Sequence, residues 1–231
     1  MVNFKTEVLR MANIKTDAQK RAKADQIAAA AWQLFEHHGF NDISMAMIAE
    51  RAGVAKGTLF NYYETKENIF MTLLLTGYRT YFDQLTRQFA QGPRLTPAAL
   101  TAELLRETTQ LIRQHGTLVR LNALRGPVLE ARADQAQTLA ERQALYATSH
   151  TLGATIAAKV LGLTAHTASH LFIVQSAVIS GLMNLAGLDE FNQHPLTVDF
   201  PDFQVDLERE SCQLFGSYLT QLFKEDSHAT Q

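Results

Sequence analysis

The sequence predicts an all-α protein of about nine helices. Signals for strands are nearly absent, because runs of β-branched residues are few and no Asn-Gly or Asp-Gly hairpin turn occurs. Apolar residues instead recur at helical spacing along almost the whole chain. The length of 231 residues, 46% of them hydrophobic, suits one large domain or two small ones with a proper core.

Three helices are expected in the first 62 residues. The first has the helical stripe Ile27, Ala31, Leu34, Phe35 and His38. Gly39 ends this helix. A short helix over residues 44–52 follows, with Ser44 as its N-terminal cap, and Gly53 separates it from a second short helix over residues 56–62.

Longer helices are expected in the rest of the chain. Thr65 caps one that ends at the Gly92-Pro93 loop. The later helices are expected over residues 97–115, from there to Arg125, and over residues 127–162, 164–187 and 201–224. Thr96 and Thr164 serve as caps, and Pro127 and Pro201 stand at first positions, where proline is tolerated. Residues 188–200 are expected to form a loop.

The pair of short helices carries most of the functional information. Helices this short are not stable alone, so their spacing indicates a packed motif. Ala49 is small where the second helix must cross, and Gly53 permits the positive φ that turns the chain. The expected common core is Ile48, Val54, Leu59 and Tyr63. This pattern predicts a helix-turn-helix, whose second helix can enter a DNA major groove.

Two lysines occupy unusual positions. Lys56 and Lys66 fall at helix N-termini, where the helix dipole disfavours a cation. A phosphate beside each lysine would be bound by the ammonium and by the free N–H groups of the helix. The alternative is that both side chains simply extend into water, at a cost of about a few tenths of a kcal/mol.

Residues 25–75 also contain a longer pattern made of seven short pieces. The pieces are Gly39-Phe40, Ile48-Ala49, Ala52-Gly53-Val54, Lys56-Gly57-Thr58-Leu59, Tyr62-Tyr63, Lys66-Glu67 and Ile69-Phe70. This pattern resembles the DNA-binding domain of TetR-family transcriptional regulators. The resemblance implies an all-helical homodimer that represses promoters until a small molecule binds, and a ligand-responsive activator is the alternative. The expected parts are a flexible extension (1–20), a DNA-binding domain (21–66) and an effector-binding and dimerisation domain (67–231).

The resemblance also implies which residues contact DNA: Ser44, Lys56, Gly57, Thr58, Phe60, Asn61, Tyr62 and Lys66. Ser44 and Lys66 would contact phosphates, and Gly57 would allow a close backbone approach. Asn61 is the best candidate for reading an adenine edge, because its amide can donate and accept at once. Phe60 and Ala55 depart from the family's frequent tyrosine and serine, which puts two hydroxyl contacts in doubt.

The formal net charge of −2 hides an uneven distribution. Nine basic and seven acidic residues precede residue 67, a net +2, and the remainder carries 12 basic and 16 acidic residues, a net −4. Lys15, Lys20, Arg21 and Lys23 crowd together and could form a local positive patch or a solvated tail. The first sixteen residues are expected to be a disordered extension, and a basic arm in the minor groove is the alternative.

The last two long helices are expected to form a dimer interface. No Asp, Glu, Lys or Arg occurs between Lys159 and Asp189, which is long enough for a membrane span. Polar residues interrupt the run and no cluster of basic residues follows it, so burial between protein helices explains it better. The apolar stripes are Leu171, Val174, Val178, Leu182 and Leu185, then Leu207, Leu214, Phe215, Tyr218 and Leu222. Two such helices from each subunit would build a four-helix interface.

An effector site is expected among polar and aromatic residues that interrupt apolar helical stretches. The candidates are Tyr78, Phe82, His115, Arg120, Asn122, Arg125, His150 and Gln175, each with ordinary packing or solvent exposure as the alternative. His166 and His170 have the i, i+4 spacing of a metal pair, but no nearby acid or cysteine completes a set. No metal or cofactor is therefore expected beyond the unidentified small-molecule effector.

Enzymatic function is not expected, because the sequence has no G-x-S-x-G, P-loop, H-E-x-x-H or dinucleotide-binding motif. A helical enzyme or a ligand-binding protein without DNA contact is the remaining alternative. Cys212 is the single cysteine and cannot form an internal disulfide, so a reducing cytoplasm is the expected location.

Overall fold

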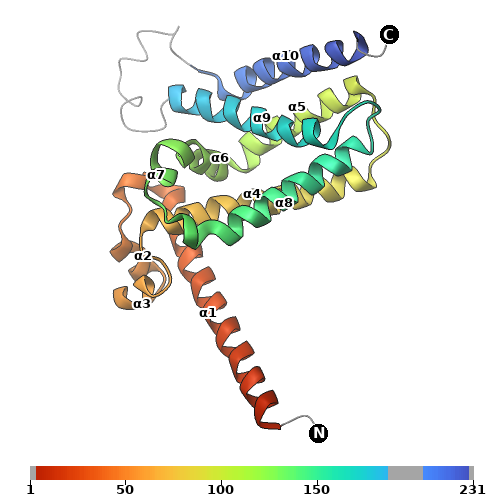
Figure 1. Cartoon of the computed structure of the whole chain (residues 1–231). Helices are drawn as coiled ribbons and strands as arrows, with labels where there is room; N and C mark the ends of the chain where they lie inside the picture. Colours follow the sequence, from red (N-terminus) through yellow and green to blue (C-terminus); the bar gives the residue numbers. More distant parts are fainter. Residues whose placement is uncertain (1–3, 187–204, 229–231) are drawn as a thin grey trace, which may run out of the picture. The chain divides into compact units, whose positions relative to one another are not determined.

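The computed structural model describes residues 4–186 and 205–228, and it places the side chains of residues 18–185 and 205–224. Within the described residues all regular structure is helical, with ten α-helices and no strand (Figure 1). This confirms the all-α prediction. The chain divides into two compact units, Met1–Leu73 and Leu74–Gln231, which we call unit 1 and unit 2.

Unit 1 begins with the long helix α1 (Phe4–His37). The sequence led us to expect a flexible extension over residues 1–20, but the helix already starts at Phe4. No glycine or proline occurs between Phe4 and His37, so nothing in the sequence stops a helix whose C-terminal half is held by packing. Residues 1–3 of the expected extension lie outside the described residues.

The predicted helix-turn-helix forms from α2 (Met45–Arg51) and α3 (Lys56–Phe60). The Ser44 hydroxyl accepts a hydrogen bond from the Met47 N–H at 3.2 Å and so caps α2. Gly53 has a φ of 62°, the conformation that lets the chain turn between the helices. Ile48, Ala49 and Leu59 are buried between the helices as expected, whereas Val54 is only half-buried.

Three phenylalanine rings anchor α2 and α3 to the rest of unit 1. The Phe70 ring lies 5.4 Å from that of Phe35 on α1 and 5.3 Å from that of Phe40, which follows α1. Phe70 belongs to the first turns of α4 (Lys66–Gln91), which Thr65 caps through a 3.2 Å bond from the Asn68 N–H. The start of α4 therefore completes the core of unit 1.

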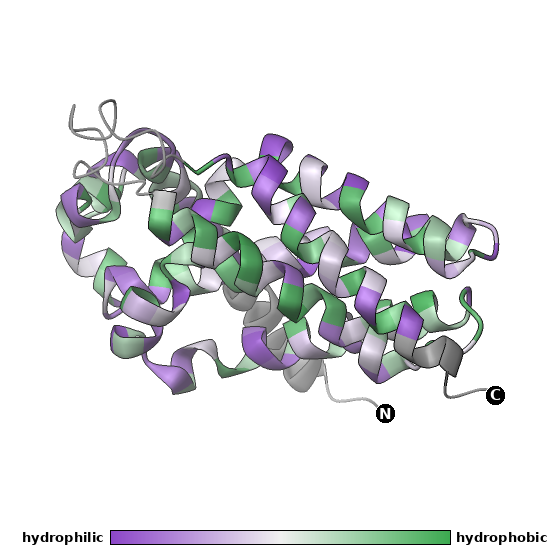
Figure 2. Ribbon diagram, turned by 90° about the horizontal axis from the view of Figure 1, so that it is seen from above, coloured by the Kyte–Doolittle hydropathy of each residue, from purple (hydrophilic) through white to green (hydrophobic). Residues whose placement is uncertain are grey.

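Unit 2 contains the remainder of α4, then α5 (Pro97–Gln114), α6 (Gly116–Ala123), α7 (Glu130–Arg132), α8 (Gln135–Ala157), α9 (Ala165–Ala186) and α10 (Leu207–His228). α9 is central, because it packs against α6, α8 and α10, and α10 also packs against α5. Figure 2 shows hydrophobic and hydrophilic residues alternating around these helices, as expected for amphipathic packing.

The prediction of a single helix over residues 127–162 is wrong. The structure instead has a π-helical turn at Arg125–Leu129, the short α7, an extended Ala133 and then α8. Asp134 causes the break, because its carboxylate accepts from the Ala136 and Gln137 N–H groups at 2.7 and 3.3 Å and starts a new helix. This break adds a helix to the expected nine.

The last helix also starts later than expected. α10 begins at Leu207, where Asp206 accepts a hydrogen bond from the Arg209 N–H at 3.0 Å and acts as the cap. The expected start at Pro201, the expected loop at residues 188–200 and the end of the preceding helix at Gly187 lie outside the described residues.

The apolar helix α9 has the length and composition of a membrane span over Ala165–Leu185. A core helix of a folded protein has the same properties, and α9 packs on three other helices of unit 2. Its crossing with α8 is very close, because a Cβ at Gly153 would lie 2.5 Å from the Ala165 carbonyl oxygen. The packing observed in unit 2 thus accounts for the buried side of α9, which is 33% of its apolar window.

Candidate nucleic-acid interface and ligand site

The helix α3 and the two residues that follow it present an outward face built from residues predicted to contact DNA. Leu59 is fully buried and fixes the helix, whereas Lys56, Gly57, Phe60 and Asn61 are exposed. Thr58 and Tyr62 are half-buried at the edges of this face. We call Lys56, Gly57, Thr58, Phe60, Asn61 and Tyr62 the reading face.

Two residues of the reading face lack an explanation in the packing of unit 1. A Cβ at Gly57 would meet no atom within 4 Å, so the fold does not require glycine there. Phe60 is 44% exposed, which is unusual for a large apolar side chain, and its ring centroid lies 6.0 Å from the Lys56 ammonium nitrogen. Both features fit a surface that meets another molecule.

Lys66 is held inside unit 1. Its ammonium nitrogen donates to the carbonyl oxygens of Phe40 and Ile43, at 2.7 Å each, and lies 4.3 Å from the Phe40 ring centroid. These contacts tie the start of α4 to the turn that precedes α2. The residue expected to bind a phosphate therefore also fixes the position of Ser44, which is exposed at the start of that helix.

In unit 2, three of the predicted effector residues come together in an aromatic cluster. Tyr78 and Phe82 of α4 have ring centroids 5.9 Å apart. Tyr81 lies between them and His115, with a centroid distance of 5.6 Å to the imidazole, and Phe172 of α9 lies 5.3 Å from Phe82. We call Tyr78, Tyr81, Phe82, His115 and Phe172 the aromatic cluster.

The Tyr81 hydroxyl is the unusual group in this cluster. The side chain is only 5% exposed, and the hydroxyl has no hydrogen-bond partner among the described residues. Burial, together with the charge of Glu107 and the proximity of Tyr78, raises the pKa of Tyr81 well above its usual value. The phenol therefore stays protonated and can donate to a group that enters the cluster. Burial likewise raises the pKa of Tyr78.

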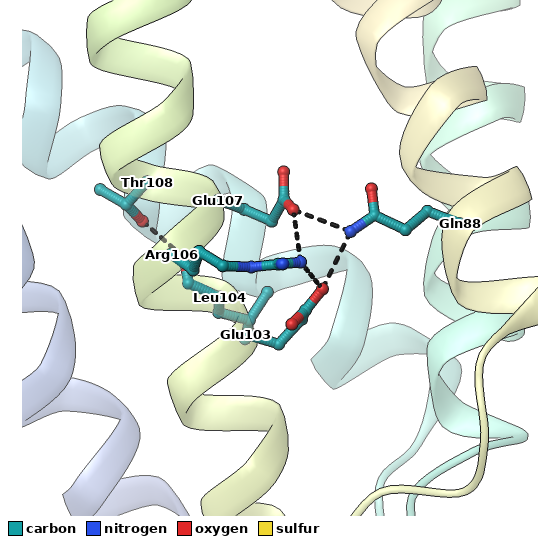
Figure 3. Close-up of polar contacts among 6 residues, drawn as sticks. All are labelled: Gln88, Glu103, Leu104, Arg106, Glu107 and Thr108. Atoms are coloured by element: carbon teal, nitrogen blue, oxygen red, sulfur yellow. Dashed lines mark hydrogen bonds and ion pairs between the residues drawn. The ribbon is translucent and has the colours of Figure 1, made fainter.

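A polar network joins α5 to Gln88 of α4 (Figure 3), and the charge of its Glu107 acts on Tyr81. The Gln88 amide donates at 2.9 Å to one carboxylate oxygen of Glu103 and, at the same distance, to one of Glu107, which is buried. Arg106 donates to the same two oxygens. The buried charge of Glu107 is therefore compensated, as its location requires.

The other predicted effector residues have varied surroundings. Gln175 is buried and donates to the Thr108 hydroxyl at 2.8 Å. Asn122 donates to Ser176 and Ser180 at 2.8 Å each, which joins α6 to α9. Arg120 is half-buried, and burial lowers its pKa.

The remaining two predicted effector residues differ in their surroundings. Arg125 pairs with Glu130 at 2.9 Å, and its charge acts on the pKa of Tyr78 against the larger effect of burial. His150 is exposed on α8. Sequence reasoning did not select Tyr81 and Phe172 for the site. Tyr81 was detectable, because it lies three residues after Tyr78 on the same helix, but only the fold brings Phe172 to this helix.

The described side chains contain no group of three or more His, Cys, Asp or Glu residues that could hold a metal ion. His166 and His170 stack with ring centroids 6.3 Å apart on α9. Cys212 is half-buried, with its sulfur 3.5 Å from the Thr109 hydroxyl and 3.8 Å from the Leu105 carbonyl oxygen.

Comparison with known proteins assigns both units. Residues 27–72 match the family described as "Bacterial regulatory proteins, tetR family", and residues 75–220 match "Tetracyclin repressor-like, C-terminal domain". A curated relative, the "Fatty acid metabolism regulator protein" of Bacillus subtilis (strain 168), is 40% identical over 55 residues, which are 24% of this chain and 28% of the relative. The match thus spans about a quarter of that relative's length.

The solved structures that this chain resembles include two regulators. One is a TetR transcriptional regulator from Rhodococcus sp. RHA1, with 19% identity, a TM-score of 0.49, and coverage of 85% of this chain and 97% of that one. The other is the transcriptional repressor FadR of Thermus thermophilus in complex with lauroyl-CoA, with 22% identity, a TM-score of 0.49, and coverage of 85% and 93%.

Proposed function

The chain belongs to the TetR family of bacterial transcriptional regulators, and from that premise we propose that it is a cytoplasmic repressor that binds a palindromic operator as a homodimer. The family consists of DNA-binding regulators rather than enzymes. The reading face of α3 carries the proposal, because it exposes Lys56, Phe60 and Asn61 on a helix held by the buried Leu59.

The residues of the reading face are proposed to contact different parts of the DNA, according to their chemistry. Asn61 and Thr58 offer hydrogen-bonding groups to base edges, and the exposed Phe60 ring suits a thymine methyl. Gly57 leaves open space through which a sugar-phosphate backbone can approach the start of α3. Lys56 supplies positive charge to a phosphate. Ser44 is proposed as a further phosphate contact at the start of α2.

Operator binding tests this division. Genomic fragments that the protein binds are sequenced, and the selected duplex is titrated at several salt concentrations. Asn61→Ala and Thr58→Ala are each expected to lose about 1–3 kcal/mol of preference at one base pair. Lys56→Ala is expected to weaken binding to all duplexes and to reduce the salt slope by about 0.9. Unchanged binding by all three variants would contradict the proposed function.

We propose that the dimer forms through α9 and α10. The predicted interface helices each keep an outward apolar residue, since Ile173 and Leu185 on α9 and Leu214 on α10 are exposed. The described outward side of α9 also carries Ala177 and Gly181, which allow a close helix approach. By contrast, Leu171 and Phe215 of the predicted stripes are buried inside unit 2.

We propose that the effector binds at the aromatic cluster and releases the operator. The unpartnered Tyr81 hydroxyl supports this site, because a buried hydroxyl without a partner costs about 1–3 kcal/mol that a ligand acceptor would recover. α4 is the proposed link, since it carries Tyr78, Tyr81 and Phe82 and also begins at Lys66 in unit 1. A change in its position would alter the spacing of two reading faces.

Tyr81→Phe tests the effector site. The variant is expected to keep its fold and operator affinity, and to gain up to about 1 kcal/mol of stability without ligand, because an unsatisfied group is removed. Its response to effector is expected to weaken about tenfold, as the loss of one hydrogen bond predicts. The relative from B. subtilis makes fatty acids the first compounds to test. Tyr146→Phe, at a 58% exposed position on α8, is the matched control.

The outcome that would reject this site is specific. If Tyr81→Phe and Tyr146→Phe respond to an active compound with the same concentration dependence as the parent, the Tyr81 hydroxyl does not contact the effector. Operator release measured by fluorescence anisotropy gives this dependence directly.

A further inference from the structure

Positive charge in unit 1 is concentrated in the N-terminal part of α1. Residues 4–23 hold six basic and two acidic residues, a net +4. Residues 24–73, which include the whole helix-turn-helix, hold three basic and six acidic residues, a net −3. The part of unit 1 that carries the reading face therefore has the same sign of charge as the DNA backbone.

Of the three basic residues in this negative part, only Lys56 lies on the reading face. Lys66 donates its ammonium protons to two carbonyl oxygens of unit 1. Arg51 donates from its Nε to the Gln33 side chain at 3.0 Å. A protein that neutralises about 6–10 phosphates needs more cations than Lys56 and Arg51, the two exposed basic residues of this part, supply in each subunit.

The N-terminal part of α1 is placed to supply the missing charge. The first buried side chain on the described part of α1 is Ile27, and Lys20 and Arg21 are exposed. Figure 1 shows the N-terminal part of α1 extending away from α2 and α3. At 1.5 Å per residue, the twenty residues 4–23 reach about 30 Å, which corresponds to about nine base pairs of duplex.

We propose that residues 4–23 form a basic arm that binds the phosphate backbone of the DNA flanking the operator. The inference rests on the DNA-binding function proposed above and adds a second contact surface to it. The reading face then selects the sequence, and the basic arm provides most of the salt-dependent, sequence-independent affinity.

A variant of the full chain that replaces five of the six basic residues of the arm tests the basic arm. The variant combines Lys5→Gln, Arg10→Gln, Lys15→Gln, Lys20→Gln and Arg21→Gln. Glutamine has nearly the helix propensity of lysine and arginine, so circular dichroism is expected to show unchanged helix content. The variant is expected to lose about three phosphate contacts. Raising the salt from 50 to 200 mM is then expected to weaken DNA binding by the parent about 40-fold more than binding by the variant.

Two further variants serve as controls. Arg87→Gln combined with Arg94→Gln removes exposed positive charge from unit 2, and its salt slope is expected to match the parent's. Glu7→Gln combined with Asp17→Asn removes negative charge from the basic arm and is expected to tighten binding to every duplex. If one arm variant binds DNA more weakly than the parent and the other binds it more tightly, misfolding does not explain the changes in affinity.

Duplex length separates this inference from the proposed function. Extending an operator duplex by about nine base pairs on each side is expected to tighten binding by the parent but not by the arm variant.

The outcomes separate the two proposals. If both proteins gain the same affinity from the longer duplex, or if the variant keeps the parent's salt slope, the basic arm is rejected while operator recognition stands. If the variant loses affinity for random duplex but neither protein prefers any sequence, the operator function fails and the arm stands. Binding of the parent to anionic phospholipid vesicles, with duplex affinity unchanged in the variant, would also overturn the arm.

Discussion

Lys66 illustrates how one residue can serve the interface without lying on it. Its position at a helix N-terminus is unfavourable for a cation by the dipole alone. The carbonyl oxygens of Phe40 and Ile43 compensate, because each accepts a charge-assisted hydrogen bond at 2.7 Å. The turn between α1 and α2 is thereby fixed, and Ser44 takes its place at the start of α2.

Lys66→Met tests this positioning role. Two carbonyl oxygens lose a charged donor, so the free energy of unfolding is expected to fall by about 1–3 kcal/mol. Urea unfolding followed by the fluorescence of Trp32, the single tryptophan, measures it. Lys56→Ala is the control and is expected to leave stability unchanged, because Lys56 is exposed.

The salt slope of operator binding distinguishes the two roles of Lys66. A positioning residue lowers affinity at every salt concentration without changing the slope. A slope reduced by about 0.9 in Lys66→Met, with normal stability, would show that its main role is a phosphate contact.

At the scale of elements, α8 and α9 cross with their backbones in close contact at Gly153. A Cβ at Gly153 would lie 2.0 Å from the Ser169 hydroxyl oxygen, and 2.5 and 2.8 Å from backbone atoms of Ala165 and Ser169. The Ser169 hydroxyl also donates to the Ser149 carbonyl oxygen at 3.1 Å, so the two helices share a hydrogen bond at the crossing. Backbone atoms cannot move aside as a flexible side chain can.

Gly153→Ala is expected to destabilise unit 2 by about 1–3 kcal/mol, because the two helices must separate. Thermal unfolding followed by circular dichroism measures the change. Gly216→Ala on α10 is the matched control, since its Cβ would meet Leu105 at an ordinary 3.5 Å. That substitution is expected to be neutral or to stabilise by up to about 1 kcal/mol through helix propensity. Equal stability of the two variants would contradict the close crossing.

At the scale of the whole molecule, the net charge of −2 combines parts of opposite sign. Residues 4–23 of α1 carry a net +4, and residues 24–231, with 15 basic and 21 acidic residues, carry a net −6. A negative body reduces binding to arbitrary DNA, so affinity depends on the few positive groups that face the duplex. Dimerisation doubles these groups, and it also fixes the spacing between two reading faces.

Ile173→Glu tests the dimer proposed through α9 and α10. Ile173 is 61% exposed on α9, so the substitution is tolerated by the fold of one chain but places a charge in the proposed interface. Sedimentation at micromolar concentration is expected to show the mass falling from twice 25.8 kDa to 25.8 kDa. Operator affinity is expected to fall with it, because each subunit reads one half-site.

Leu139→Glu provides the matched control for the dimer. Leu139 is 52% exposed on α8, away from the proposed interface helices, and its variant is expected to sediment as the parent does. A parent that sediments at 25.8 kDa would reject the dimer, and an unchanged mass in Ile173→Glu would reject this interface.

The sequence by itself determined the all-α class, the helix-turn-helix and most caps, because these depend on neighbours within a few residues. Ser44, Thr65 and Thr96 each cap a helix as predicted, and Gly53 adopts a positive φ. The single helix predicted over residues 127–162 was wrong, because the Asp134 cap outweighed the preference of Pro127 for a helix start. The flexibility expected of residues 1–20 stays a prediction, and in the structure α1 begins at Phe4.

Only the tertiary structure decided which candidate residues act together. It joined Phe172 to Phe82 and left the Tyr81 hydroxyl without a partner among the described residues. It also turned the Lys66 ammonium onto two carbonyl oxygens of its own unit. Such contacts join residues about 25 to 90 positions apart, and the free energy that selects them comes from packing and desolvation in the folded chain, which helical periodicity does not encode.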